Sequence, residues 1–185
     1  MNMFFRFFYQ LFRARFAVKL EVNAVDRCQM RVWPNDLDVN IHLNNGRYLS
    51  LMDLGRTRLS IRSGLFKKAK EMGWGYGVVG GLNITYFKSL SCFQKFTLTT
   101  KLAGHYDGWL YLEQRFESQE KLAAAALVKV TFVGKKGRIP AEDIIKSMGV
   151  DHIGENKEYL EHLFKSEQEF LKSIKQDYSS KTSQV

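Results

Sequence analysis

The feature that most constrains the fold is a strict alternation of apolar and polar residues in three stretches between residues 95 and 133. The alternation runs through 95–102, 110–117 and 128–133. A period of two is typical of β-strands with one buried face and one solvent-exposed face. The turns between these stretches, HYDGW and SQEK, are short, and short turns join antiparallel neighbours. We therefore predict an antiparallel sheet with one apolar face, which RCQMRVW (27–33) and the β-like VVGGLNITYF extend.

A single long helix is predicted over 45–63. Its apolar face holds Tyr48, Leu51, Met52, Gly55 and Leu59, while Arg58 and Arg62 are expected largely off that face. One apolar helix face and one apolar sheet face must bury each other, which predicts a two-layer α+β domain whose twisted sheet wraps the helix. Gly55 in mid-helix would be explained by another backbone packing closely against it.

Composition narrows the class of protein. The chain has 185 residues and a net charge of +9, which fits one domain with appendages and a partner such as an anionic membrane, a phosphate-bearing ligand like coenzyme A, or nucleic acid. The basic residues are spread along the chain and no stacking motif accompanies them, so nucleic-acid binding is not expected.

Cys28 and Cys92 stand in no metal-binding spacing, and reduced thiols favour a cytoplasmic location. GYGVVG (75–80) precedes a β-like run and is interpreted as a turn into a strand, not a nucleotide-binding loop.

The decapeptide DLDVNIHLNN (36–45) concentrates the candidate chemistry. Asp38, Asn40 and His42 are spaced by two, so in an extended segment their side chains would share one side. Asn44 or Asn45 would cap the following helix, whose first amides and positive dipole end would lie close by. A carboxylate, an imidazole and an oxyanion site suffice for acyl transfer to water. A helix-capping loop without catalytic function explains the same residues.

Both termini differ from this central part, and we divide the chain into 1–18, 19–148 and 149–185. The N-terminal segment MNMFFRFFYQLFRARF has aromatic residues at helical spacing, with Arg6, Gln10 and Arg13 on the other side. It fits an interfacial helix on an anionic membrane, peripheral to the inner face, or a helix packed onto its own domain or a dimer partner. The C-terminal segment is charged and is predicted to be an amphipathic helix with a tail.

The stretch NDLDVNIHLNNGRYLSLMDLGR resembles the signature of the hotdog-fold thioesterases. Its DxNxHxNN pattern is similar to that of plant acyl-carrier-protein thioesterases, and DLD followed by Tyr48 is similar to the 4-hydroxybenzoyl-CoA thioesterase-like group. The resemblance covers about residues 25–145. It implies a hotdog fold and identifies Asp38 as the catalytic carboxylate, with Asn40 and His42 matching the plant-type asparagine and histidine. Ile41 stands where many bacterial relatives have glycine.

Together these features predict an acyl-CoA thioesterase that needs neither a metal nor a cofactor. Asp38 would act as general base or nucleophile, with His42 and Asn40 orienting the water or the carbonyl. The thioester carbonyl would lie at the helix N-terminus, bound by the surroundings of Asn44, Asn45, Gly46 and Tyr48. A homodimer is expected, since one hotdog unit leaves a sheet edge open. A non-catalytic acyl-CoA-binding or scaffold protein, and an acyl-carrier-protein thioesterase, remain as alternatives.

Overall fold

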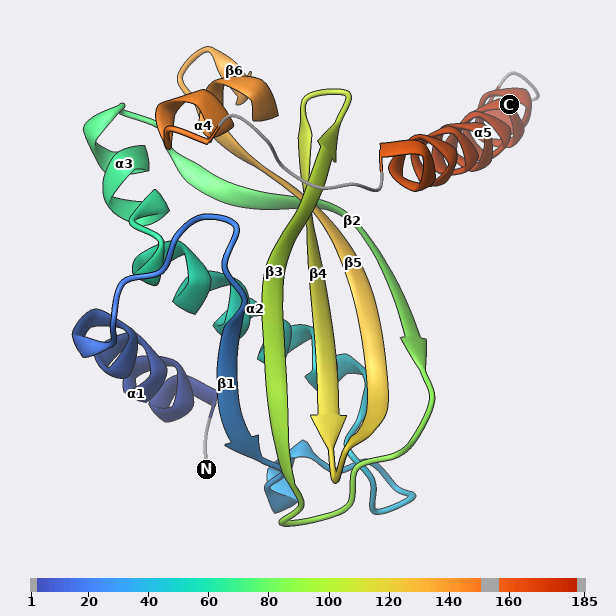
Figure 1. Cartoon of the computed structure of the whole chain (residues 1–185). Coiled ribbons are helices and arrows are strands. Elements are labelled where there is room, and N and C mark those ends of the chain that lie inside the picture. The colour runs from blue at the N-terminus through green and yellow to red at the C-terminus, as the bar shows by residue number, and fades with distance from the viewer. Residues whose placement is uncertain (1–2, 151–156, 183–185) are drawn as a thin grey trace.

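The antiparallel sheet expected from the alternation forms the centre of the molecule. The computed structural model describes residues 3–150 and 157–182. The strands run antiparallel in the order β1-β3-β4-β5-β2, and the short β6 pairs with β5. Figure 1 shows the long strands curling around one helix. The strand bounds are β1 Asp26–Arg31, β2 Tyr76–Tyr86, β3 Lys95–Tyr106, β4 Trp109–Ser118, β5 Lys121–Gly134 and β6 Gly137–Ile139.

The wrapped helix is α2, Asn45–Arg62, which confirms the prediction of a long helix over 45–63. Its face with Tyr48, Leu51 and Met52 is buried in the same core as Leu98 and Phe116 of the sheet. Burying these two apolar faces against each other is the main stabilising contribution that this architecture can make. The fold is therefore the predicted α+β hotdog fold.

Gly55 explains how closely helix and sheet approach. A Cβ atom at this position would lie 2.6 Å from the Thr100 side-chain oxygen and 2.8 Å from a Leu98 methyl carbon. We expected a neighbouring backbone to require the glycine, and the structure places side chains of β3 there instead. The absence of a side chain lets α2 settle onto the sheet.

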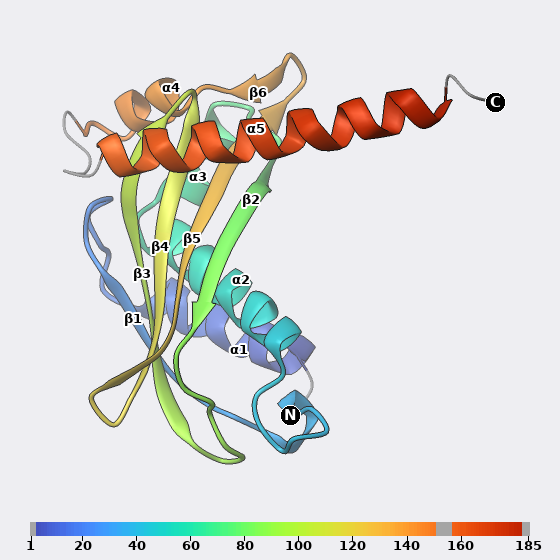
Figure 2. The same ribbon diagram turned by 90° about the vertical axis from the view of Figure 1, so that its right-hand side faces the viewer.

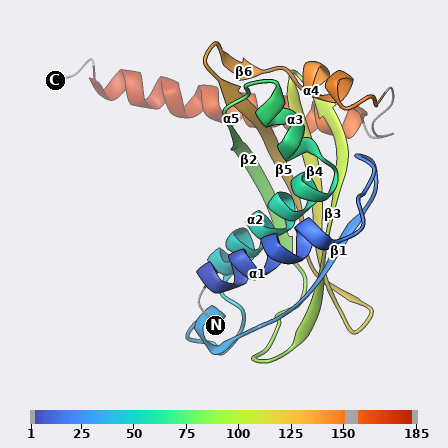
Figure 3. The same cartoon turned by 90° about the vertical axis from the view of Figure 1, so that its left-hand side faces the viewer.

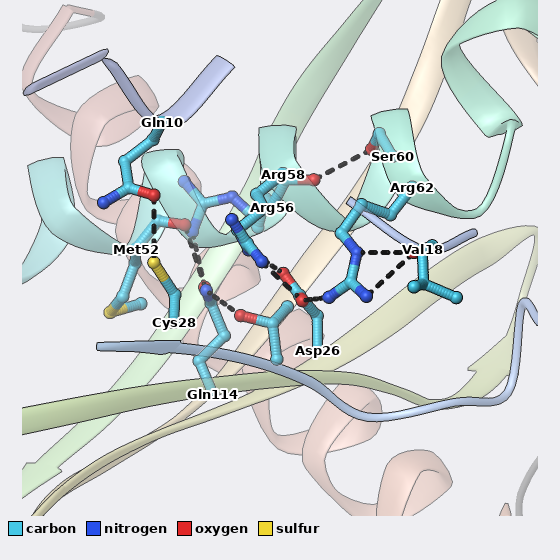
Figure 4. Close-up of polar contacts among 11 residues, drawn as sticks. Gln10, Val18, Asp26, Cys28, Met52, Arg56, Arg58, Ser60, Arg62 and Gln114 are labelled. Atoms are coloured by element: carbon cyan, nitrogen blue, oxygen red, sulfur yellow. Dashed lines mark hydrogen bonds and ion pairs between the residues drawn. The ribbon is translucent and has the colours of Figure 1, made fainter. Parts of the chain in front are cut away.

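Two arginines of α2 point toward the domain, in contrast to the prediction. Arg58 Nε lies 2.9 Å from a carboxylate oxygen of Asp26 at the start of β1, and Arg62 pairs with the same carboxylate. Arg62 also donates to the carbonyl of Val18 at 2.8 Å. Figure 4 shows these contacts converging beside α2. Because buried charges need partners, the Asp26 carboxylate accounts for the burial of Arg58.

Three short helices were not predicted: η1 Pro34–Asp36, α3 Leu65–Glu71 and α4 Ala141–Ser147. The last of these buries Ala141, Ile144 and Ile145 in a second apolar cluster with Leu110 of β4. Together α3 and α4 cover one end of the sheet, as Figure 1 shows. Helices this short carry too few turns for a periodic pattern to stand out.

The two terminal helices lie on opposite faces of the sheet. Helix α1, Met3–Phe16, lies beside α2, and Figure 3 shows the pair. Helix α5, Lys157–Thr182, packs on the face that carries Tyr111 and Lys129, where Leu160 is buried and Lys129 Nζ lies 2.5 Å from Glu167. Figure 2 shows α5 crossing the sheet and continuing past the edge strand β2. The segment 151–156 and the end of the predicted tail, 183–185, lie outside the described residues.

Candidate functional site

The polar decapeptide forms a closed turn that leads directly into α2. Leu37 and Leu43 form an antiparallel bridge, and the amide of Asp38 donates to the carbonyl of His42 at 2.9 Å. A second bridge joins His42 to Ser91, and the amide of Leu43 donates to Leu90 at 2.8 Å. The turn is thereby fastened to the connection between β2 and β3 as well as to the helix.

The carboxylate of Asp38 is half-buried and is held by this turn. Its Oδ1 accepts hydrogen bonds from the backbone amides of Asn40, at 2.9 Å, and His42, at 3.3 Å. The segment is a turn and not the extended stretch that the spacing suggested, so the carboxylate contacts the backbone of these residues. Ile41 adopts a φ of 59°, a conformation that costs a β-branched residue energy and that glycine adopts freely.

The start of α2 is capped as the sequence predicts. Asn44 is the N-cap, and its Oδ1 accepts the amide of Gly46 at 2.8 Å. The Gly46 amide is therefore already engaged, while the amide of Asn45 has no hydrogen-bond partner within the described part of the chain. Of the two amides expected to polarise a carbonyl, that of Asn45 is the more available.

Tyr48 lies in the core beneath the first turn of α2. Its ring packs edge-on against Tyr86, with centroids 5.1 Å apart, and against Phe116, at 4.7 Å. Burial raises the pKa of the Tyr48 hydroxyl to about 12. The neighbouring Tyr86 hydroxyl donates to the carbonyl of Asn45 at 3.2 Å. This aromatic pair supports the helix N-terminus from below.

Asp36 is an important residue that the sequence analysis did not single out. It is buried, and its Oδ2 lies 2.5 Å from Arg6 of α1 and accepts the amide of Trp33 at 3.0 Å. Its carbonyl accepts the amide of Asn44 at 2.8 Å. Asp36 thus joins α1, η1 and the start of α2. The pattern DLD shows two similar carboxylates, and spacing alone does not tell which one is buried.

A cavity of about 450 Å³ lies under the second half of α2. It is bounded by α2, α3, α4 and the strands β2, β3, β4 and β5, and most of its wall is apolar. Asp53 and Arg56 of α2 supply polar groups, and burial lowers the pKa of Arg56 although the Asp53 carboxylate counteracts the shift. Its apolar lining includes Leu59, Leu102, Leu110, Leu112, Val130 and Trp74. Sequence reasoning missed this cavity because its walls come from segments far apart in the chain.

The cavity and the turn are separate places along α2. Asp38, Asn40 and His42 do not line the cavity. Gly46 and Asp53 are seven residues apart, so the helix start and the near wall of the cavity are separated by about 10 Å. Among the described residues, no cluster of three or more His, Cys, Asp or Glu side chains could hold a metal ion.

Comparison with known proteins identifies the family. The model of the thioesterase-like superfamily matches residues 32–147. That span contains the turn, α2 and every strand of the curled sheet except β1. The chain belongs to the thioesterase-like superfamily.

The similar curated proteins cover only part of the chain. It is 40% identical over 85 residues to Protein THEM6 of Xenopus laevis, which is 46% of this chain and 41% of that protein. It is 30% identical over 117 residues to Protein THEM6 of Drosophila melanogaster, which is 62% of this chain and 60% of that protein. The chain therefore matches about half the length of these relatives.

Solved structures show the same fold at low sequence identity. A probable thioesterase from Bartonella henselae has a TM-score of 0.57 and 22% identity, over 63% of this chain and 100% of that one. A gentisyl-coenzyme A thioesterase has a TM-score of 0.57 and 16% identity, over 65% and 99%. A Staphylococcus aureus protein solved in complex with CoA has a TM-score of 0.58 and 16% identity, over 70% and 84%.

Proposed function

We propose that this protein hydrolyses acyl-CoA thioesters to the free acid and CoA. The observation that carries the proposal is the Asp38 carboxylate, held by two backbone amides immediately before the N-terminus of α2. Membership of the thioesterase-like superfamily supports this chemistry. Two proteins of the same fold are described as a gentisyl-coenzyme A thioesterase and as a complex with CoA, which supports a CoA thioester as substrate.

In the proposed mechanism the thioester carbonyl lies at the start of α2. The amide of Asn45 and the positive end of the helix dipole stabilise the developing oxyanion, where one such donor is typically worth about 3 kcal/mol. Asp38 takes a proton from the attacking water, or attacks the carbonyl itself to form an anhydride that water then hydrolyses. Asn40 and His42 orient the water or the carbonyl, and the CoA thiolate leaves and is protonated.

The cavity under α2 is the proposed site of the acyl group. Its volume of about 450 Å³ and apolar wall with few polar groups fit a small-molecule pocket. An acyl group whose carbonyl lies near Gly46 must extend about 10 Å to reach Asp53 at the cavity wall. We therefore expect medium-chain or long-chain acyl-CoA to be preferred over acetyl-CoA.

The proposed working unit is a homodimer formed through β2. This strand is the last in the sheet order, and its residues are mostly exposed although it is eleven residues long. Such an open edge is a template for pairing with another strand. A second copy would continue the sheet and enclose the start of α2 in a cleft between subunits.

Replacement of Asp38 tests the catalytic proposal. Asp38→Asn keeps the hydrogen bonds from Asn40 and His42 but removes the base, so thiol release from a panel of acyl-CoA substrates should become undetectable. His42→Ala should lower kcat by about 100-fold, as expected for an orienting group. Glu71→Gln on α3 removes an exposed carboxylate and serves as the control with unchanged rate. A folded Asp38→Asn protein with the wild-type rate would remove the proposal.

Two alternatives are separated by the same reagents. A non-catalytic acyl-CoA-binding or scaffold protein would bind acyl-CoA in calorimetry and release no thiol. An acyl-carrier-protein thioesterase would hydrolyse the carrier-linked acyl group with a much higher kcat/KM than the CoA ester.

The two free cysteines, one of them buried, support the proposed cytoplasmic location.

A further inference from the structure

Helix α1 packs against the domain with a side that carries Arg6, Gln10 and Ala14, and its Met3 and Phe7 side chains are partly buried against the core. Arg6, Gln10 and Ala14 are buried, with exposures of 3%, 6% and 2%. The aromatic side points away from the domain, and its side chains are 53% to 72% exposed. These outward residues are Phe4, Phe5, Phe8, Tyr9, Phe12 and Phe16. Most of the aromatic side chains of α1 therefore face away from the domain, whereas a surface helix usually turns its apolar side to the core.

The inward contacts fix this orientation. Arg6 Nη1 lies 2.5 Å from Asp36 Oδ2, and its Nη2 donates to the carbonyl of Arg31 at 3.0 Å. Gln10 Oε1 accepts the thiol proton of Cys28 at 3.2 Å. Rolling α1 to bury its aromatic side would separate Arg6 from the buried Asp36 carboxylate and leave that carboxylate only the more distant Arg47, whose Nε lies 3.8 Å from Asp36 Oδ1. Breaking a buried ion pair in this way is unfavourable. The aromatic side therefore stays outward.

The chemistry of this face fits a lipid surface. A contiguous set of exposed aromatic side chains marks an interaction site, and aromatic rings flanked by arginine are typical of helices that lie in the interface of an anionic bilayer. Arg13 and Arg15 supply positive charge in the last turn of α1. The helix has 14 residues and is about 21 Å long, shorter than the hydrocarbon core. No helix within residues 3–150 and 157–182 is long and apolar enough to cross a membrane.

The position of α1 distinguishes lipid from a second copy of the chain. Figure 1 shows α1 beside β1, at the opposite side of the sheet from the open edge strand β2. Pairing through β2 therefore leaves the aromatic face of α1 uncovered. We infer that α1 docks flat on an anionic lipid surface, with its aromatic face among the acyl chains and Arg13 and Arg15 at the phosphates.

Docking in this orientation brings the candidate site to the membrane. Arg6 of α1 holds Asp36, and Asp38 follows two residues later in the same turn. Figures 2 and 3 show α1 and α2 side by side, with the start of each at the end of the molecule where this turn lies. The position of the turn near lipid bears on substrate supply only if the proposed hydrolysis is correct. The docking itself does not depend on it.

Sedimentation of the full chain with vesicles tests the inference. The wild-type protein should pellet with vesicles of phosphatidylcholine and phosphatidylglycerol and much less with phosphatidylcholine alone. The triple variant Phe5→Ser, Phe8→Ser and Phe12→Ser should stay in the supernatant, because it lacks three of the exposed aromatic side chains. Its α1 should remain docked on the domain, because the inward contacts of Arg6 and Gln10 are kept. The matched control removes three exposed aromatic side chains elsewhere, Phe87, Tyr159 and Phe170, and should pellet like wild type.

The charge contribution is measured separately. Arg13→Gln with Arg15→Gln should weaken partitioning onto the anionic vesicles by about 30-fold, from about 1 kcal/mol per basic residue. Circular dichroism and thermal unfolding establish that every variant is folded. Equal pelleting of the wild type and the triple serine variant overturns the inference. The inference is also overturned if the wild-type protein does not pellet with anionic vesicles. It is overturned as well if the wild-type protein self-associates in the absence of lipid through the three phenylalanines. None of these readouts uses hydrolysis, so the docking can fail while the enzymatic proposal stands.

Discussion

Asp36 and Asp38 stand two positions apart and have different surroundings. Asp36 is 1% exposed and pairs with the buried Arg6 of α1, whereas Asp38 is half-buried and accepts backbone amides. One carboxylate therefore joins α1 to the turn, and the other is the proposed catalytic group. Substitution by asparagine should separate these two roles.

Asp36→Asn should destabilise the protein by about 3–5 kcal/mol, because it leaves the Arg6 guanidinium buried without its counter-charge. Asp38→Asn should cost less than about 1 kcal/mol, since an amide oxygen still accepts both hydrogen bonds. Urea unfolding at pH 7 measures both. The double variant Arg6→Met with Asp36→Asn should recover much of the loss. Equal effects of the two asparagine substitutions would contradict the assigned burial.

Tyr111 of β4 gives a prediction for alkaline pH. Burial, followed by nearby acidic groups, raises the pKa of its hydroxyl to about 12 from an ordinary value of 10.0. The folded state thus holds this proton more tightly than the unfolded state, so the stabilisation is complete below pH 10 and is lost as the pH rises toward 12. Among the described residues the hydroxyl has no hydrogen-bond partner.

Tyr111→Phe should therefore raise the free energy of unfolding by about 1 kcal/mol at pH 7, since it removes a buried unsatisfied group. It should also make the loss of stability between pH 10 and pH 12 less steep. Denaturant unfolding across this pH range checks both effects. Tyr76→Phe, at an exposed position of β2, is the control, and a destabilised Tyr111→Phe would show that the hydroxyl is satisfied in solution.

At the scale of elements, the contact between α2 and the sheet depends on Gly55. Gly55→Ala should gain about 1 kcal/mol of helix propensity. Its Cβ would nevertheless meet the buried Thr100 and Leu98 side chains at 2.6 Å and 2.8 Å, so we expect a net loss of about 2 kcal/mol from overpacking. Thermal unfolding measures the change. As a control, Leu49→Ala on the exposed side of α2 should change the stability by no more than about 0.5 kcal/mol. An unchanged stability in Gly55→Ala would show that the neighbouring side chains of the sheet move aside to accommodate the methyl group.

The sequence predicted the long elements and missed how some of them pack. The period of two predicted β3, β4 and β5, and the face around Leu51 predicted α2, because long regular elements repeat their pattern many times. The orientation of α1 was not predictable, since its burial depends on Arg6 meeting Asp36 thirty residues away. The site was predicted as a set of neighbouring residues. The turn geometry at Asp38 and the engagement of Gly46 by Asn44 come from tertiary contacts that spacing does not encode.

At the scale of the whole molecule, the open edge of β2 predicts the assembly. Leu82 and Thr85 are exposed on this strand. Replacing both with lysine should place like charges against each other in a dimer and abolish strand pairing. Sedimentation should then change from about twice the chain mass of 21.5 kDa to the chain mass itself. Gln29→Lys on the other edge strand, β1, should leave the dimer intact, and a dimer that survives the β2 substitutions would rule out this edge.

The hydrogen bond between Cys28 and Gln10 makes the alkylation rate of Cys28 a measure of how often α1 leaves the domain. The thiol is 4% exposed beneath α1, and burial raises its pKa, so both access and thiolate formation are suppressed while the helix is in place. Cys92 is only half-buried and supplies an internal comparison for the same alkylating reagent. The alkylation rate of Cys28 relative to that of Cys92 therefore reports how readily α1 separates from the domain. The comparison can be made in solution and on vesicles, without any engineered label.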